Sequence, residues 1–317
     1  MAYTQRYSYF DLSRAYTPFY YSATPTSADG RSYSLNLLNE FSATEYLNYT
    51  QGAKVQNTTT SMEAAVNYNR TFAEKHSFSG LLVSLLGNYL NANGGTLQLS
   101  LPFRNQGLSG RFTYGYDNRY LLEANFGYNG SERFAANHRY GFFPSMGVAW
   151  NVSNEKFMQS LAGVVSKLKF RATYGLVGND QIGDPNDRFF YLSNVNLSDA
   201  GRAARFGTDY SFTRNGVSIS RYSNEDITWE QAQTTNIGMD LSLFGSMNLI
   251  VDVYRQHRTN ILMNRAYIPN TMGLAAGIQA NVGEAEVKGV DLSLDYNKNF
   301  GSMWIQGRST FTYATNK

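Results

Sequence analysis

The sequence contains no cysteine among its 317 residues. This absence excludes disulfide scaffolds, cysteine-based zinc sites and thiol catalysis. Charge is also scarce, because only 16% of the residues are charged, and 27 Lys and Arg against 24 Asp and Glu leave a formal net charge of +3. A nucleic-acid-binding protein carries a stronger positive excess. We therefore expect no nucleic-acid partner.

Long hydrophobic runs are missing as well. The longest stretch without Asp, Glu, Lys or Arg is 76–103, and its most apolar part is GLLVSLLG at 80–87. A membrane-spanning helix needs about 20 consecutive apolar residues, so the sequence predicts no such helix. The N-terminal residues MAYTQRYSYF lack the apolar core of a secretory signal peptide. If the protein is extracytoplasmic, we expect this sequence to be an internal or mature segment of it.

Aromatic residues and glycine are abundant. Aromatic residues make up 15% of the chain, and there are 28 Gly against 6 Pro, a composition that favours strands and turns. Polar and apolar residues alternate in segments of about ten, the length of a tilted strand that crosses a bilayer. The strictest case is 167–174, where Leu168, Phe170, Ala172 and Tyr174 alternate with Lys167, Lys169, Arg171 and Thr173. Similar alternation predicts strands at 61–72, 110–117, 120–130, 237–243 and 290–296.

The connections between these strands alternate in length. Short turns are expected at 73–76, 118–120, 244–246 and 297–302, and longer segments at 88–108, 131–141, 175–235 and 258–286. A connection of intermediate length, 153–165, occupies a short-turn position, and we expect a helical turn at 154–158. The pattern predicts an antiparallel up-and-down sheet with two unlike rims, as in transmembrane β-barrels with short periplasmic turns and long extracellular loops.

Hairpin register can be predicted from the apolar faces, which must coincide on paired strands. A loop at 118–120 pairs Tyr116 with Leu122, and a loop at 244–246 pairs Leu243 with Met247. Three-residue loops are a common hairpin class, so neither pairing is forced.

Alternation alone also fits a soluble β-sandwich, whose polar face meets water. A Lys or Arg facing lipid at the bilayer midplane costs roughly 2 to 4 kcal/mol, so in a barrel the charged face must line the lumen. Aromatic residues near strand ends fit the girdles at membrane interfaces and favour the barrel. The predicted girdle residues are Phe112, Tyr116, Tyr120, Tyr128, Trp150, Tyr174 and Tyr296. The predicted lumen-facing residues are Glu123, Lys167, Lys169, Arg171, Asp240 and Asp291.

Five sequence blocks resemble the SusC/RagA-like TonB-dependent outer-membrane transporters. They are LPFRNQGLSGRFTYGYDNRYLLEANFGYNGSERF (101–134), YGFFPSMGVAWNVSNEKFM (140–158), LKFRATYGLVGNDQIG (168–183), TWEQAQTTNIGMDL (228–241) and NVGEAEVKGVDLSLDY (281–296). The resemblance implies a barrel of 22 strands, of which residues 1–317 supply ten to twelve, counting 2–12 and 31–41 as candidates. The family's plug domain and closing C-terminal strands have no match here. The chain would then be an internal part of the barrel.

The resemblance also implies a function and partners. It implies a bacterial outer-membrane importer of glycan oligomers or peptides, powered through the TonB complex by way of the plug domain, with a SusD-like lipoprotein over the extracellular loops. The lipid bilayer is the remaining partner. Two alternatives stay open: a soluble or surface-attached β-rich adhesion or carbohydrate-binding module, and a passive porin.

The long segment 175–235 carries the candidate ligand-binding residues. Aromatic rings in an exposed loop can stack on sugars or hold peptides, while the simpler alternative is a loop packed against itself. The candidates are Phe189, Phe190, Tyr191, Tyr210 and Phe212.

Catalytic, metal and cofactor motifs are missing from the sequence. His76, His138 and His257 have no metal-ligand spacing, and no nucleophile elbow or phosphate-binding loop occurs. Asp180, Asp184 and Asp187 could offer oxygen ligands to Ca²⁺, but their spacing differs from that of an EF-hand. We therefore expect no enzyme activity, no bound metal and no cofactor.

Overall fold

The computed structural model of the chain describes residues 2–9, 12–13, 17–44, 50–51, 55–183 and 188–317. Asp184 and Asp187, from the acidic loop, lie outside the described residues. The chain divides into two compact units, of which the first comprises 1–3, 61–88 and 103–317 and the second 4–60 and 89–102. In the described residues, no helix combines the length and the apolar character that crossing a membrane would require.

The second unit contains small elements in its described part. The hairpin of β3 (Tyr21–Pro25) and β4 (Tyr33–Leu37) pairs Tyr21 with Leu37, and β2 (Leu12–Ser13) pairs with β5 (Thr50–Gln51). The short helix α1 (Leu97–Ser100) begins after Thr96, whose hydroxyl accepts a hydrogen bond from the Leu99 amide at 3.3 Å. The strand predicted at 31–41 corresponds to β4. Its place in the large sheet was predicted wrongly, because β4 belongs to a separate two-stranded sheet.

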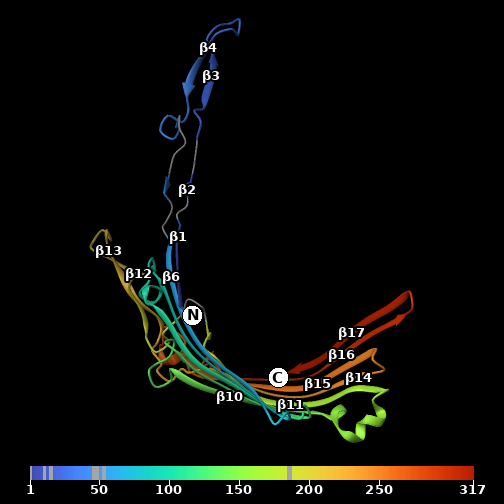
Figure 1. Cartoon of the computed structure of the whole chain (residues 1–317). Coiled ribbons are helices and arrows are strands. Elements are labelled where there is room, and N and C mark those ends of the chain that lie inside the picture. The colour runs from blue at the N-terminus through green and yellow to red at the C-terminus, as the bar shows by residue number, and fades with distance from the viewer. Residues whose placement is uncertain (1, 10–11, 14–16, 45–49, 52–54, 184–187) are drawn as a thin grey trace. The chain divides into compact units, whose positions relative to one another are not determined.

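An antiparallel sheet of eleven strands dominates the described part of the chain (Figure 1). Its order is β1-β6-β7-β8-β9-β10-β11-β14-β15-β16-β17, so β1 and β17 are its edges and it does not close. The bounds are β1 (Ala2–Tyr9), β6 (Val55–Phe72), β7 (His76–Asn91), β8 (Phe103–Tyr116), β9 (Tyr120–Ser131), β10 (Tyr140–Asn151), β11 (Val165–Asn179), β14 (Glu230–Leu243), β15 (Met247–Asn264), β16 (Gln279–Phe300) and β17 (Met303–Asn316). The predicted all-β, antiparallel up-and-down class is confirmed.

Two ends of the sheet carry connections of different length. Tight turns join β8 to β9, β14 to β15 and β16 to β17 at one end, together with the 3₁₀ helices η1 (Val152–Asn154) and η2 (Lys156–Leu161) between β10 and β11. The other end carries the segments 132–139, 180–229 and 265–278, of which the last includes the 3₁₀ helix η3 (Asn270–Met272). We call these the short-turn end and the long-loop end. The predicted alternation and the helical turn near 154–158 are confirmed.

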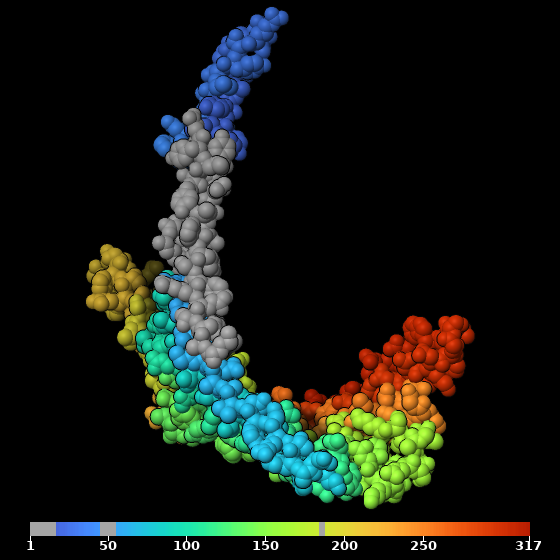
Figure 2. All heavy atoms as spheres, viewed as in Figure 1, coloured from blue at the N-terminus to red at the C-terminus, as the bar shows by residue number. Residues whose placement is uncertain are grey.

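The longest connection contains a hairpin of its own, formed by β12 (Asn194–Phe206) and β13 (Phe212–Arg221). Figure 2 shows this yellow hairpin as a lobe at one end of the sheet in the first unit, and the yellow-green connection of η1 and η2 as a lobe at the other. The strands are long, with 18 residues in β15 and 22 in β16.

The two predicted hairpin registers had different outcomes. Leu243 pairs with Met247 around a turn at 244–246, as predicted. The other prediction was wrong by two residues, because Tyr116 pairs with Tyr120 around a turn at 117–119. The turn predicted at 297–302 is also shorter, because β16 continues to Phe300. The register error keeps each side chain on its predicted face, since a shift of two preserves the strand's alternation.

Candidate functional site: two unlike faces and two unlike rims

One face of the sheet is apolar across eight strands. Directly opposed residues share a face, so the pairing of the strands aligns whole rows of side chains. The first apolar row contains Tyr114, Leu122, Val148, Ala172, Ile237, Val253, Val290 and Tyr313. The second contains Tyr116, Tyr120, Trp150, Phe170, Met239, Val251, Leu292 and Phe311.

This apolar face is uncovered. Ile237 is 61% exposed, Phe170 42% and Tyr174 44%. In a β-sandwich these side chains would be buried against a second sheet. Among the described residues no second sheet lies over them, so the apolar face needs an apolar environment from outside the chain.

The apolar face has marked boundaries. Tyr116, Tyr120 and Trp150 stack in sequence at the short-turn end, with successive ring centroids 6.5 Å apart. Towards the long-loop end, Arg255 and Lys288 oppose each other two residues beyond Val253 and Val290. An apolar band between aromatic and charged borders has the arrangement of a membrane-facing surface.

The opposite face carries an ion-paired cluster. Arg171 on β11 places Nε 3.2 Å from Asp240 Oδ1 and a terminal guanidinium nitrogen 2.7 Å from Asp252 Oδ2. Lys167 Nζ lies 3.3 Å from the second oxygen of Asp240. The cluster therefore joins β11 to β14 and β15, and it orients four charged groups on one face of the sheet.

Gly238 makes the contact between Arg171 and Asp252, which lie two strands apart, possible. It lies on β14 directly between Arg171 and Asp252 in the strand register. A Cβ at position 238 would approach the Arg171 guanidinium carbon and an Asp252 carboxylate oxygen to 2.7 Å each. Gly238 and Asp252 were not among the predicted residues, although the predicted 244–246 hairpin register places them opposite each other.

The remaining predicted lumen residues share the face of this cluster. Lys169 opposes Asp240, and Asp291 opposes Asp252. Glu123 on β9 forms an ion pair with Arg111 at 2.8 Å. The structure thus brings Lys167, Lys169, Arg171, Asp240 and Asp291 into one region and leaves Glu123 on the same face several strands away. Their contact with a lumen stays a prediction.

The long-loop end has its own hydrophobic core. The buried residues are Phe134, Phe143, Ile182, Phe190, Ile227 and Trp229, with Leu262 packed against them. They come from β10, β15 and the connections 132–139 and 180–229. The Trp229 ring centroid lies 5.3 Å from those of both Phe134 and Phe143. The loops at this end are therefore packed into a common structure on the sheet.

Buried polar groups hold these loops in place. The Arg221 guanidinium lies over the Phe190 ring at 5.3 Å and donates to the carbonyl oxygens of Arg188, Phe189 and Leu192 at 3.0 to 3.2 Å. Asn281 donates from its amide nitrogen to the carbonyls of Thr228 and Asn260 at 3.0 and 2.7 Å. No local sequence pattern predicts these contacts, because they join residues far apart in the chain.

The five predicted ligand-binding aromatics are not brought together. Phe190 is 1% exposed and Phe189 5%, so both follow the alternative of a loop packed against itself. Tyr191 is half-buried, and its ring is 6.1 Å from that of Phe189. Tyr210 and Phe212 lie at the turn of the β12–β13 hairpin and are 67% and 54% exposed. Of the five, only these two are exposed, and the Arg214 guanidinium lies over the Phe212 ring at 5.2 Å. Their binding role stays a prediction.

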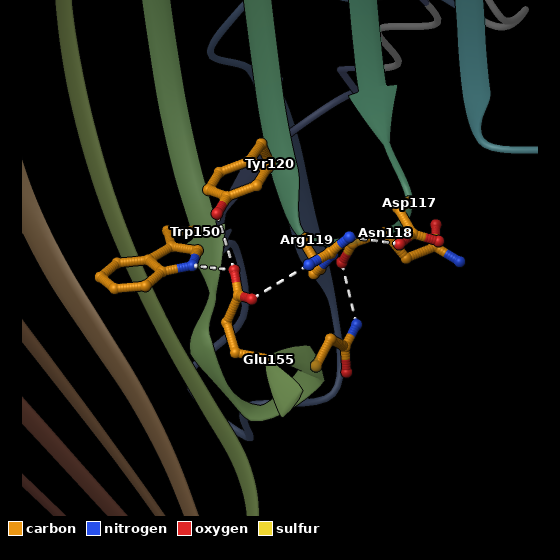
Figure 3. A network of polar contacts seen from close by, with 7 residues as sticks. Asp117, Asn118, Arg119, Tyr120, Trp150 and Glu155 are labelled. Atoms are coloured by element: carbon orange, nitrogen blue, oxygen red, sulfur yellow. Dashed lines mark hydrogen bonds and ion pairs between the residues drawn. The ribbon is translucent and has the colours of Figure 1, made fainter. Parts of the chain in front are cut away.

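The short-turn end is fixed by a polar network around Glu155 (Figure 3). Glu155 Oε1 accepts hydrogen bonds from the Tyr120 hydroxyl at 2.8 Å and from Trp150 Nε1 at 3.1 Å, and Oε2 accepts one from Arg119 at 3.1 Å. Arg119 also binds Asp117 at 2.6 Å. These contacts, that of Tyr120 foremost, hold the pKa of Glu155 below its usual value.

Two asparagines complete this network. Asn151 and Asn154 both donate from their side-chain amides to the Asn118 carbonyl, at 2.7 and 2.9 Å. The turn after β8 is thereby joined to the connection after β10. This network was not predicted from the sequence, because its contacts between the two connections join residues more than 30 positions apart.

Comparison with known families decides the identity of the fold. The family model described as "TonB dependent receptor-like, beta-barrel" matches residues 2–317. The chain belongs to the TonB-dependent receptor family. The predicted SusC/RagA-like resemblance is confirmed, and the family's barrels lie in the bacterial outer membrane, as predicted for this chain.

Several relatives of this TonB-dependent receptor chain are known. TonB-dependent receptor P39 of Formosa agariphila is 30% identical over 259 residues, covering 72% of this chain and 23% of that protein. TonB-dependent receptor SusC of Bacteroides thetaiotaomicron is 32% identical over 187 residues, covering 59% of this chain and 18% of SusC. The chain thus spans about a fifth of the length of these relatives.

A solved structure has the same fold. The RagAB peptide importer in its closed-closed state superimposes with a TM-score of 0.64 at 23% sequence identity. The match covers 83% of this chain and 30% of that one. The two folds are therefore alike over most of this chain and less than a third of that one.

Proposed function

We propose that this chain forms part of the barrel wall of an outer-membrane importer of glycan oligomers or peptides. The main support for this proposal is that the uncovered sheet has two unlike faces. One face has unbroken apolar rows, and the other has the Arg171 cluster. An apolar face suits hydrocarbon, and charged side chains on the other face avoid the cost of exposing Lys or Arg to lipid. The wall itself performs no bond chemistry.

We assign the apolar rows to lipid and the Arg171 cluster to the lumen. An open sheet edge leaves backbone N–H and C=O groups that lipid cannot satisfy, so further strands must flank β1 and β17 in the membrane. Those strands, the C-terminal ones included, and a plug domain would belong to the rest of a longer protein. The fraction of P39 and SusC that this chain covers supports the assignment.

The proposed cargo class follows from the relatives. RagAB is described as a peptide importer, and SusC is a sequence relative. The hairpin aromatics Tyr210 and Phe212 supply exposed rings at the long-loop end, where cargo would first make contact. A SusD-like lipoprotein would cover this end, and the TonB complex would act through the plug domain.

Uptake experiments test the proposal. Deleting the complete gene should abolish import of labelled glycan oligomers or peptides, and the intact gene should restore it. Dissipating the proton-motive force with a protonophore should stop import by the restored strain. Import that survives the protonophore would point to the passive porin instead, and import that survives the deletion would refute the proposal.

A further inference from the structure

We propose that residues 155–164, which follow η1 in the connection between β10 and β11, form a lipid-interface anchor that inserts into the periplasmic leaflet of the outer membrane. This inference rests on the proposed assignment of the apolar rows to lipid. Residues 155–164 would contact the phospholipid headgroups and the upper part of the acyl chains beside the short-turn end. These residues are named the anchor segment below.

The anchor segment is fastened to the apolar face of the sheet. Tyr120 and Trp150 both belong to the second apolar row, and their rings are stacked at an interplanar angle of 11°. The Tyr120 hydroxyl and Trp150 Nε1 both donate a hydrogen bond to Oε1 of Glu155. Because the rings lie on the apolar face, the carboxylate that receives their tips, and the segment that carries it, lie at the border of that face (Figure 3).

The charge of Glu155 is compensated in this position. Its second oxygen accepts a hydrogen bond from Arg119, so the carboxylate does not enter the border region as an isolated anion. A buried, unpaired carboxylate beside hydrocarbon would be expensive. Tyr and Trp with their rings in an apolar layer and their tips on polar partners are typical of membrane interfaces.

Large apolar side chains of the anchor segment remain uncovered. Met158 is buried, whereas Phe157 is 63% exposed, Leu161 49% and Val164 44%. Phe244 in the neighbouring turn is 65% exposed, and its amide donates to the Val164 carbonyl at 2.7 Å. These side chains lie just beyond the ends of β10, β11 and β14, next to the border of the apolar band that Tyr120 and Trp150 form.

A charged residue accompanies these apolar side chains. Lys156 is exposed next to Phe157, which suits the anionic headgroups of a phospholipid surface. Short amphipathic segments of this kind bury their apolar side chains roughly 5 to 10 Å deep in the headgroup and acyl boundary. Continuity with the lipid-facing band, the interfacial rings and the charge of Lys156 together favour lipid over an aqueous position.

Fluorescence quenching in proteoliposomes tests the inference on the complete receptor. In a background free of other accessible cysteines, Phe157→Cys and Leu161→Cys are labelled with a polarity-sensitive dye. The vesicles contain phosphatidylethanolamine and phosphatidylglycerol, with quenchers attached near the headgroup or near the acyl-chain end. Both probes should lose more fluorescence to the shallow quencher than to the deep one.

Two further positions serve as matched controls. Ile237→Cys, in the middle of the first apolar row, should be quenched mainly by the deep quencher. Thr208→Cys, exposed in the β12–β13 turn, should be quenched by neither. If the Ile237 probe is quenched but both anchor probes are not, the anchor is refuted and the barrel assignment survives. If the Ile237 probe also escapes quenching, the lipid-facing assignment itself fails.

Discussion

Arg171 reaches carboxylates on two neighbouring strands because position 238 has no side chain. Its guanidinium crosses β14 above Gly238 to Asp252, and its Nε contacts Asp240 on the way. Glycine is required at position 238 because the Arg171 side chain passes close to the backbone there, and not because the backbone needs an unusual conformation. A glycine inside a strand lowers the stability of that strand. The ion pairs of Arg171 must offset this loss of stability.

We predict that Gly238→Ala destabilises the barrel by about 1 to 3 kcal/mol, the usual cost of forcing an extra carbon into a packed site. The added Cβ would displace Arg171 from Asp252. The measurement is the free energy of unfolding of the complete receptor in urea, in vesicles. Gly307→Ala is the control, because no atom lies within 4 Å of a Cβ at that position. Equal stability of the two variants would contradict the prediction.

The Glu155 carboxylate gives the short-turn end a pH dependence. Its pKa is lowered in the folded state by the contacts of Tyr120, Trp150 and Arg119. A group with a lowered folded pKa contributes stability above its unfolded pKa of about 4.3 and loses it as the pH falls through the folded value. The wild-type protein should therefore lose this contribution only below roughly pH 4.3.

Glu155→Gln removes that contribution at neutral pH. We expect the melting temperature of the variant to lie below that of the wild type at pH 7 and the difference to shrink as the pH falls through the acidic window. Thermal unfolding followed at a series of pH values measures this. Glu74→Gln, an exposed carboxylate in the turn after β6, is the control and should show no such convergence. A difference that stays constant with pH would refute the role of the ionised carboxylate.

At the scale of elements, the long-loop end depends on its buried aromatic core. We predict that Phe190→Ala destabilises the packed loops by about 3 to 5 kcal/mol, since it empties a fully buried ring site. Tyr210→Ala should change stability by no more than about 0.5 kcal/mol, because that side chain is exposed. Denaturant unfolding monitored by Trp229 fluorescence compares the two. Similar losses in both variants would show that the core does not hold the loops.

Most elements could be predicted from the sequence, because alternation fixes which residues share a face. The 118–120 turn was misplaced since Asp117 and Asn118 both adopt positive φ, 50° and 52°, and begin the turn one residue earlier. Asn and Asp tolerate this conformation, so the signal was present in the sequence. The turn at 297–302 was predicted too long because Gly301, with φ 63°, reverses the chain within a short turn while the polar residues before it stay paired.

The candidate site was only partly predictable. The charged face followed from alternation, and Asp252 could have been added from the predicted hairpin register. Burial of Phe189 and Phe190 depends on Arg221 and Trp229, which lie much further along the same connection, and on Phe134 in a different one. No periodic pattern encodes such contacts, so a loop's aromatic residues cannot be divided into packed and free ones from sequence alone.

At the scale of the whole molecule, the two faces of the sheet must tolerate charge differently. We predict that Ile237→Arg, in the middle of the first apolar row, costs about 2 to 4 kcal/mol in a bilayer. Thr310→Arg, exposed on the face of Lys169 and Asp240, should cost far less. Unfolding free energies of the complete receptor in lipid vesicles provide the comparison. Equal costs would remove the distinction between a lipid side and a water side.

The length of β16 has a mechanical consequence. A strand tilted across hydrocarbon uses about 9 to 11 residues, whereas β16 has 22. Since each strand residue adds roughly 3.3 Å, about half of β16 would extend beyond the hydrocarbon layer at the rims of the sheet. This part of β16 is held by its ladder with β15. Under the proposed function, we therefore expect gating to come from other parts of the receptor and not from bending of this rim.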